Sequence, residues 1–339
     1  MGCRIRHWIP NTVYSAVIRC VDRQFLLKPN HDPQQHPLLA KGCPETSLRA
    51  ETKTLPRPSV LNTIGAAVAR AQKLHPVHVH AVEANVNHLQ LLVSADKSQI
   101  ANLSPFFQTL DSTIARSLNR THHRDGRLWS SRVRVTPCID DRAAEQQLLY
   151  ILTNPVKDGL LESVAESPLF TTYTSLAHGK PLRYWRIDWS AYQLAGGSRK
   201  KGHSPKDYLE WLRLELDPLP HQAGWAEHRR RAWVRRQVRE FEEAKAAEMR
   251  AEGRRALGAS ALFALDPRGR PREAKENGPQ PLCHASDPVA RREYVKQWRE
   301  LVRAYRAASI EYRLGMWERE FPEGTFRPPL VRCCGVLRL

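Results

Sequence analysis

The chain has 339 residues, of which 53 are Lys or Arg and 35 are Asp or Glu, so its formal net charge is +18 at pH 7. This length allows two domains, and a hydrophobic content of 41% excludes a wholly disordered protein. Because such a positive excess usually faces an anionic partner, we expect nucleic acid binding. A basic protein with a merely solvated surface is the alternative.

Neither a membrane anchor nor a cysteine-based site is expected. No apolar run approaches the roughly twenty residues that span a bilayer, and the start lacks the apolar segment of a secretory signal. We therefore expect a cytoplasmic protein without membrane contact. The seven cysteines are scattered without a Cys-x-x-Cys pair, which disfavours a zinc site and a disulfide framework.

The N-terminal half alternates strand patterns and helix patterns, which are separated by proline-rich or polar turns. In chain order, the sequence predicts a strand at 12–18, a long polar insertion at about 29–58, a helix from Ser59 to Pro76, strands at 77–84 and 88–94, a helix opened by Ser104 and Pro105, a strand at 132–136, and a helix from Asp140 or Asp141 to Pro155.

This β-α-β-β-α-β-α order is typical of an α+β sandwich in which helices pack on one face of an antiparallel sheet. We expect it to form a first domain over residues 1–165. A basic, mainly helical region over residues 166–339 follows, with a Gly/Lys/Arg-rich connection at 179–201 and helical patterns near 226–257 and 287–316. The basic run 228–236 could either follow phosphates or cover the first domain.

Two polar side chains alternate within the apolar strand 88–94. Residues two apart on a strand point to the same face, so His88 and Gln90 project together while Leu89 and Leu91 point to the core. An imidazole and a carboxamide oxygen can both bind a divalent ion, and the oxygen donor suits Mg²⁺ or Mn²⁺. A hydrogen-bonded structural histidine is the alternative interpretation of His88.

The helix before Pro155 carries a second polar pair. Tyr150 and Asn154 are one helical turn apart, and with Gln146 and Gln147 they give the helix a polar edge that indicates the wall of a site. A half-buried packing tyrosine and an Asn-Pro helix stop are the alternatives.

Cations and a flat ring cluster near the predicted fourth strand, a combination that suits single-stranded nucleic acid. These candidate DNA contacts are Arg127, Trp129, Arg132, Arg134 and Arg120. For any single member, a solvated surface charge is the alternative.

Four segments resemble the single-tyrosine HUH transposases, and in particular their REP-associated branch. They occur in the order and at the spacing of that family: Arg19 with Gln24-Phe25-Leu26-Leu27, Asn87-His88-Leu89-Gln90-Leu91-Leu92, Gly126-Arg127-Leu128-Trp129-Ser130-Ser131-Arg132, and Tyr150 to Leu160 with its Asn154-Pro155-Val156-Lys157. Together they cover about residues 10–162.

The resemblance implies a ferredoxin-like domain, a homodimer, and action on single-stranded DNA with hairpin or palindromic ends. It assigns His88, Gln90 and Asn154 as ligands of Mg²⁺ or Mn²⁺ and Tyr150 as the nucleophile. Such a tyrosine cleaves and rejoins DNA through a 5′-phosphotyrosine and needs no nucleotide cofactor.

Gln90 departs from the family pattern, which has histidine at that position. A neutral amide is a poorer ligand for transition metals than imidazole, so activity could be weakened. Two alternatives follow: a DNA-binding protein of the same fold that has lost catalysis, and an RNA-binding ferredoxin-like module. His78-Val79-His80 is a second histidine pair, but it lacks the flanking residues of the family pattern, so we expect surface or supporting roles for it.

Overall fold

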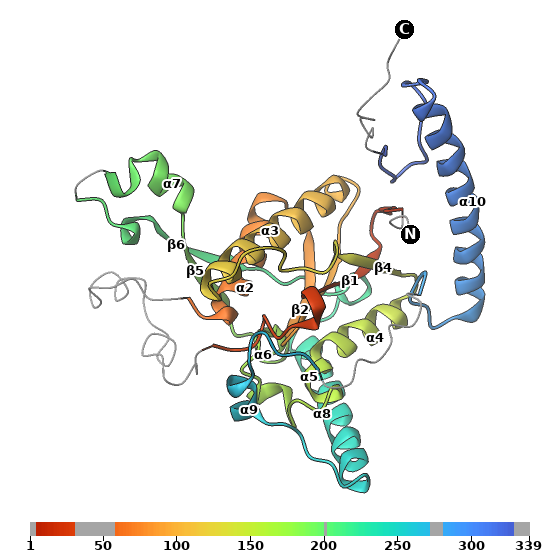
Figure 1. The fold of residues 1–339 in the computed structure, drawn as a ribbon. Coiled ribbons are helices and arrows are strands. Elements are labelled where there is room, and N and C mark those ends of the chain that lie inside the picture. The colour runs from red at the N-terminus through yellow and green to blue at the C-terminus, as the bar shows by residue number, and fades with distance from the viewer. Residues whose placement is uncertain (1–4, 31–57, 200–201, 272–280, 329–339) are drawn as a thin grey trace.

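A computed structural model describes residues 5–30, 58–199, 202–271 and 281–328 (Figure 1). The predicted insertion at about 29–58 therefore lies outside the described residues, except at its ends. No helix in these described ranges is long and apolar enough to cross a membrane. Cys20, Cys138 and Cys283 are buried and form no disulfide.

Four strands form one antiparallel sheet. The strands are β1 (Val13–Arg19), β2 (His78–Asn85), β3 (His88–Ser94) and β4 (Arg134–Cys138), and their order in the sheet is β2-β3-β1-β4. All three neighbouring pairs are antiparallel. The four predicted strands are confirmed, although β4 begins two residues later than expected.

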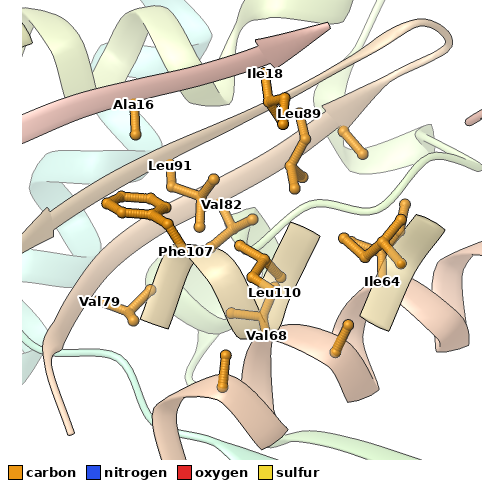
Figure 2. Close-up of a cluster of buried hydrophobic side chains, with 14 of the residues drawn as sticks. Ala16, Ile18, Ile64, Val68, Val79, Val82, Leu89, Leu91, Phe107 and Leu110 are labelled. Carbon is orange, nitrogen blue, oxygen red and sulfur yellow. The ribbon is translucent and has the colours of Figure 1, made fainter. Parts of the chain in front are cut away.

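Helices α2 (Val60–Leu74) and α3 (Leu103–Thr121) cover one face of this sheet. The Ser59 hydroxyl accepts a hydrogen bond from the Asn62 amide and caps α2, as the sequence predicts. Figure 2 shows the resulting core, in which side chains of both helices meet alternate residues of the strands. They include Ile64, Val68, Phe107 and Leu110 from the helices and Ala16, Ile18, Leu89 and Leu91 from the strands.

The opposite face is also covered, which corrects the expectation of helices on one face. Helix α4 (Asp141–Leu152) buries Leu148 and Ile151 against Leu92 of β3. Because each face of β3 meets helices, every residue of this strand is buried. The pattern of α4 is amphipathic like that of α2 and α3, and nothing local in it specifies which face of the sheet it covers.

The predicted last helix of the first domain is in fact two helices. Helix α4 ends at Leu152, and Asn154–Lys157 form the short helix α5 with Pro155 in its first turn. Proline has no amide hydrogen to donate and its ring fixes φ, so it ends one helix and suits the start of another.

The region after residue 165 packs into the same cores, so the predicted boundary does not separate two cores. An antiparallel hairpin of β5 (Leu182–Ile187) and β6 (Leu209–Leu214), which the sequence did not predict, packs on α2. Helices α6 (Tyr173–His178) and α8 (Glu227–Ala251) pack beside α4, where Val234 and Val238 of α8 are buried.

The remaining helices lie at the periphery (Figure 1). They are α7 (Trp189–Leu194), α9 (Ala259–Ala264) and α10 (Pro288–Arg313). Short 3-10 turns occur at Val21–Arg23, Ile100–Asn102, Val164–Glu166, Gly197–Arg199, Pro205–Tyr208 and Pro220–Gln222. Helices α8 and α10 confirm the two predicted helical patterns of this region.

Segments of the C-terminal region also lie along both outer strands of the sheet. Beside β2, the Ala84 amide donates to the Phe170 carbonyl and the Thr172 amide donates to the Val82 carbonyl. Beside β4, the His284 amide donates to the Pro137 carbonyl, and His284 forms a bridge with Cys138. Both edges are therefore paired along these stretches.

The contact between α2 and the hairpin gives a test of this shared core. A Cβ atom at Gly65 would lie within 2.5 Å of ring atoms of the buried Tyr184. We expect Gly65→Val to lower the free energy of unfolding by about 1–3 kcal/mol through overpacking, measured by urea denaturation. Gly224→Val is the control, because no atom lies within 4 Å of its Cβ position. Equal stability of the two variants would contradict the packing of the hairpin on α2.

Candidate functional site

A cleft of about 1120 Å³ opens on the α4 side of the sheet. Three groups of residues line it. The strands contribute Val17, Arg19, His88, Gln90 and Arg134; α4 and α5 contribute Tyr150, Asn154 and Lys157; and the C-terminal region contributes Lys245, Met249, Arg254, Arg255 and His284. The structure thus brings the four residues predicted for metal binding and catalysis to one cleft.

Antiparallel register places two polar pairs on the face of the sheet that α4 covers. Glu83 of β2 lies opposite Gln90 of β3, and Asn85 lies opposite His88. Such directly opposed side chains have Cβ atoms about 5 Å apart. The side chain of Asn154 lies beside these pairs, and its amide nitrogen is 2.8 Å from His88 Nε2 and 3.4 Å from Glu83 Oε2.

The His88 ring is held in an orientation that suits a metal ligand. His88 Nδ1 lies 2.8 Å from Asn87 Oδ1, so an Nδ1–H donor leaves the Nε2 lone pair facing Asn154. Burial lowers the pKa of the His88 imidazole to about 3, and the positive charges of Arg19 and Lys157 act in the same direction. At neutral pH the ring is therefore uncharged, which is the form that binds metals.

Two buried oxygens of this group have no hydrogen-bond partner within the described residues. They are Gln90 Oε1 and Glu83 Oε1. Burial also raises the pKa of the Glu83 carboxyl well above its usual range. A buried oxygen acceptor without a partner costs about 1–3 kcal/mol, so these atoms indicate a place for a hydrogen-bond donor or a cation.

The sequence analysis did not identify Glu83. The available signal was an acidic residue inside the apolar pattern of 77–84, at a position that antiparallel pairing aligns with Gln90. The hairpin turn fixes that register, so this residue could have been found from the strand pairing alone.

The donors fit a divalent cation that prefers oxygen. Imidazole nitrogen, amide oxygens and a carboxylate are all available, and such oxygen-rich sets suit Mg²⁺ or Mn²⁺. In the described ranges, no three His, Cys, Asp or Glu side chains form a metal cluster among themselves. A cation here would therefore depend on the amides of Gln90 and Asn154.

Tyr150 stands at the exposed side of the cleft, with 38% of its surface accessible. Lys157 Nζ donates a hydrogen bond of 2.9 Å to the Tyr150 hydroxyl and lies 4.0 Å from the centre of its ring. Although the break at Thr153 puts Tyr150 on α4 and Asn154 on α5, both side chains still line the cleft.

The predicted DNA contacts are only partly gathered at this cleft. Arg134 lines it, whereas Arg127 and Arg132 are exposed outside its lining. Trp129 packs against the α2–α3 core and donates its indole N–H to the Asp111 carbonyl at 3.0 Å. Arg120 lies 5.4 Å above the ring of Trp189, away from the lining.

The cleft is nevertheless strongly basic. Its lining includes seven Lys or Arg residues, namely Arg19, Arg23, Arg134, Lys157, Lys245, Arg254 and Arg255, against the two acidic residues Asp158 and Glu248. Sequence reasoning missed most of these cations because they come from distant segments that only the fold brings together. Low-dielectric walls lined by one sign of charge concentrate anions.

The second histidine pair has a structural role. His80 Nδ1 lies 3.0 Å from the Asp217 carbonyl oxygen, and Nε2 lies 2.8 Å from Ser94 Oγ. A neutral ring satisfies both contacts, with one nitrogen donating and the other accepting. Burial lowers the pKa of His80 to about 4. His78 lies 3.3 Å from the Asp217 carboxylate at the surface.

No protein-family model and no curated protein sequence matches the chain. Among solved structures, the chain is similar to a REP-associated tyrosine transposase bound to a REP hairpin, with a TM-score of 0.34 and 14% sequence identity. The match covers 53% of this chain and 87% of that chain.

His80 gives a pH-dependent prediction. Above its ordinary pKa of 6.5 the ring is neutral in both the folded and the unfolded chain. Between about pH 6.5 and pH 4, the unfolded chain takes up a proton that the folded chain excludes, which lowers stability by up to about 1.4 kcal/mol per pH unit.

We therefore expect His80→Gln to show a shallower loss of unfolding free energy on acidification from about pH 6 to pH 4.5 than the unsubstituted chain. Urea denaturation at several pH values measures both slopes. The comparison of slopes is independent of any overall loss of stability in the variant. Parallel slopes would contradict a buried, neutral His80.

Proposed function

We propose that this protein is a metal-dependent endonuclease and strand transferase that cleaves and rejoins single-stranded DNA through Tyr150. One observation carries the proposal: the Tyr150 hydroxyl shares a basic cleft with His88, Gln90 and Asn154. The motif resemblance of residues 10–162 assigns these same four residues to that chemistry. The β-α-β-β-α-β order with its β2-β3-β1-β4 sheet supports a ferredoxin-like domain.

The polar residues around Tyr150 would have separate roles in this reaction. His88, Gln90 and Asn154 would hold Mg²⁺ or Mn²⁺, which when bound polarises a phosphoryl oxygen and positions the scissile phosphate. Asn87 fixes the tautomer of His88 through its 2.8 Å contact. Lys157 donates to the Tyr150 oxygen at 2.9 Å, so its ammonium stabilises negative charge that develops on that oxygen.

In the cleavage step the Tyr150 oxygen bonds to phosphorus and the bond from phosphorus to the 3′-oxygen breaks. The phenol proton passes to water, and the departing oxygen takes a proton from water to become a 3′-hydroxyl. The phosphotyrosine ester conserves the bond, so the 3′-hydroxyl of a second strand can reverse the step and join new ends. No nucleotide is consumed.

The C-terminal region contributes to the proposed DNA channel. Lys245 of α8 and the following Arg254 and Arg255 line the same cleft as Arg19 and Arg134 of the sheet. Phosphates bound in the cleft would meet cations from both regions of the chain, and these contacts supply affinity independent of sequence. The proposed partner is single-stranded DNA with hairpin or palindromic ends, bound by a homodimer.

Replacement of the nucleophile tests the proposal. The protein is incubated with hairpin-bearing single-stranded DNA and Mg²⁺ or Mn²⁺, and the covalent adduct is resolved on a denaturing gel. We expect an adduct that EDTA prevents and that Tyr150→Phe abolishes, because phenylalanine lacks the attacking oxygen. Tyr305→Phe is the control: Tyr305 is a tyrosine of α10 whose hydroxyl donates to the Phe326 carbonyl, outside the cleft lining.

An undiminished adduct in Tyr150→Phe would assign the nucleophile elsewhere and refute the proposal. Salt-sensitive DNA binding without an adduct would favour the non-catalytic DNA-binding alternative. A preference for RNA together with indifference to EDTA would favour the RNA-binding alternative.

The C-terminal residues that line the cleft give a separate prediction about the affinity for single-stranded DNA. For single-stranded DNA, the slope of log K against log salt changes by about 0.7 for each phosphate that a cation neutralises. We expect the double variant Arg254→Ala and Arg255→Ala to bind more weakly, with a slope shallower by about 1.4, measured by fluorescence anisotropy.

The matched control removes two arginines of α8 that do not line the cleft. Arg236 and Arg239 are exposed and pair with Glu240 and Glu243 on their own helix. Their replacement by alanine changes the net charge equally, so it separates local contacts from the overall charge. An equal change of slope in both double variants would contradict the proposed channel.

A further inference from the structure

Glu83 is a fully buried carboxylate in the middle of β2. Its Oε2 accepts a hydrogen bond of 3.4 Å from the Asn154 amide, and its Oε1 has no partner. Among the described residues, no Lys, Arg or His forms an ion pair with it, and the nearby charge of Asp158 is also negative. A buried carboxylate normally pairs with a cation or coordinates a metal.

The pairing of β2 on both sides keeps the Glu83 side chain away from solvent. The backbone of β2 is paired on one side with β3 and on the other with the segment around Thr171, with which Glu83 forms a bridge. The carboxylate therefore stays on the face of the sheet that carries His88 and Gln90. It lies behind the cleft lining rather than in it.

The unpartnered atoms of this face lie on opposed residues of neighbouring strands. Gln90 is opposite Glu83 in the register, 3% exposed, and its Oε1 also lacks a partner. The Asn154 amide group touches both His88 Nε2 and Glu83 Oε2 with its nitrogen. Four side chains from β2, β3 and α5 thus lie on one face of the sheet, and the Asn154 amide nitrogen links His88 to Glu83 there.

We propose that Glu83 is the anionic ligand of a divalent cation site completed by His88, Gln90 and Asn154. The inference deepens the proposed function, on which it rests for the use of this cation in the Tyr150 reaction. His88, Gln90 and Asn154 are all neutral, so they provide no charge against a doubly positive ion. Glu83 provides that charge, and carboxylate oxygen is a preferred ligand of Mg²⁺ and Mn²⁺.

A different role for Glu83 is to orient Asn154 through their hydrogen bond. Glu83→Gln distinguishes the two roles, because glutamine keeps the shape and an oxygen acceptor for Asn154 but removes the charge. If Glu83 only orients Asn154, cation affinity is unchanged in this variant. If Glu83 is a ligand, affinity falls.

The experiment is titration calorimetry of Mn²⁺ into the full chain, without DNA. We expect the unsubstituted chain to bind Mn²⁺ and Glu83→Gln to bind it at least about 10-fold more weakly, because the variant loses the one negative charge of the proposed ligand set. Thermal melting gives a second readout: Mn²⁺ raises the Tm of the unsubstituted chain, whereas the variant melts at least as high without metal and gains little from Mn²⁺. Asp111→Asn is the matched control, another carboxylate with a buried oxygen that lacks a partner, on α3 and outside the cleft lining.

Equal Mn²⁺ affinity of the unsubstituted chain and Glu83→Gln would overturn the proposal, as would a loss of the same size in Asp111→Asn or no Mn²⁺ binding by the unsubstituted chain. If Glu83→Gln does not fold, infrared difference spectra of the unsubstituted chain with and without Mn²⁺ replace it: a carboxylate ligand changes its stretching bands, and unchanged carboxylate bands would overturn the proposal. Mn²⁺ binding that depends on Glu83 in a chain that forms no DNA adduct would support this site and refute the proposed catalysis.

Discussion

The structure depends on one constraint, which is that strand β3 is covered on both faces. Helices α2 and α3 seal one face with aliphatic and aromatic side chains, and α4 closes the other. Most polar side chains of β2 and β3 on the second face are therefore buried beside the cleft, where each must find a partner or carry a cost of about 1–3 kcal/mol. Most of them do: His80 bonds to Ser94, and Asn85 donates to Asp158. Glu83 and Gln90 each keep one buried oxygen without a hydrogen-bond partner among the described residues.

The strands and helices of the first half were predicted from the sequence because the residues that determine each of them are neighbours in the chain. Alternation of apolar residues predicted all four strands, and the Ser59 cap and the 3.6-residue period predicted α2. The side of the sheet on which α4 packs was not predictable from α4 itself, since an amphipathic helix fits either face. The hairpin of β5 and β6 was missed because its region read as a basic, mainly helical tract, while its packing partner Gly65 lies far away in the sequence.

The candidate site was predictable where its residues share a strand or a helix turn. Spacing drew attention to His88 with Gln90 and to Tyr150 with Asn154, and the family resemblance supplied their expected roles. A helix break at Thr153 separates the second pair. Residues that reach the cleft only through tertiary folding were missed, as with Arg254 and Arg255. Trp129 was predicted as a DNA contact from its flat ring, and in the structure the partly buried ring packs against the core while its indole N–H donates to the Asp111 carbonyl.

The segments that pair with the outer strands also bear on how copies of this chain can meet. Thr171 bridges β2 at one edge of the sheet, and His284 bridges β4 at the other. A strand of another molecule would have to displace these segments before it could hydrogen-bond there. The C-terminal region thus protects both edges of the sheet from pairing with a strand of another molecule. Its removal would expose two unpaired sheet edges and would also take away part of the cleft lining.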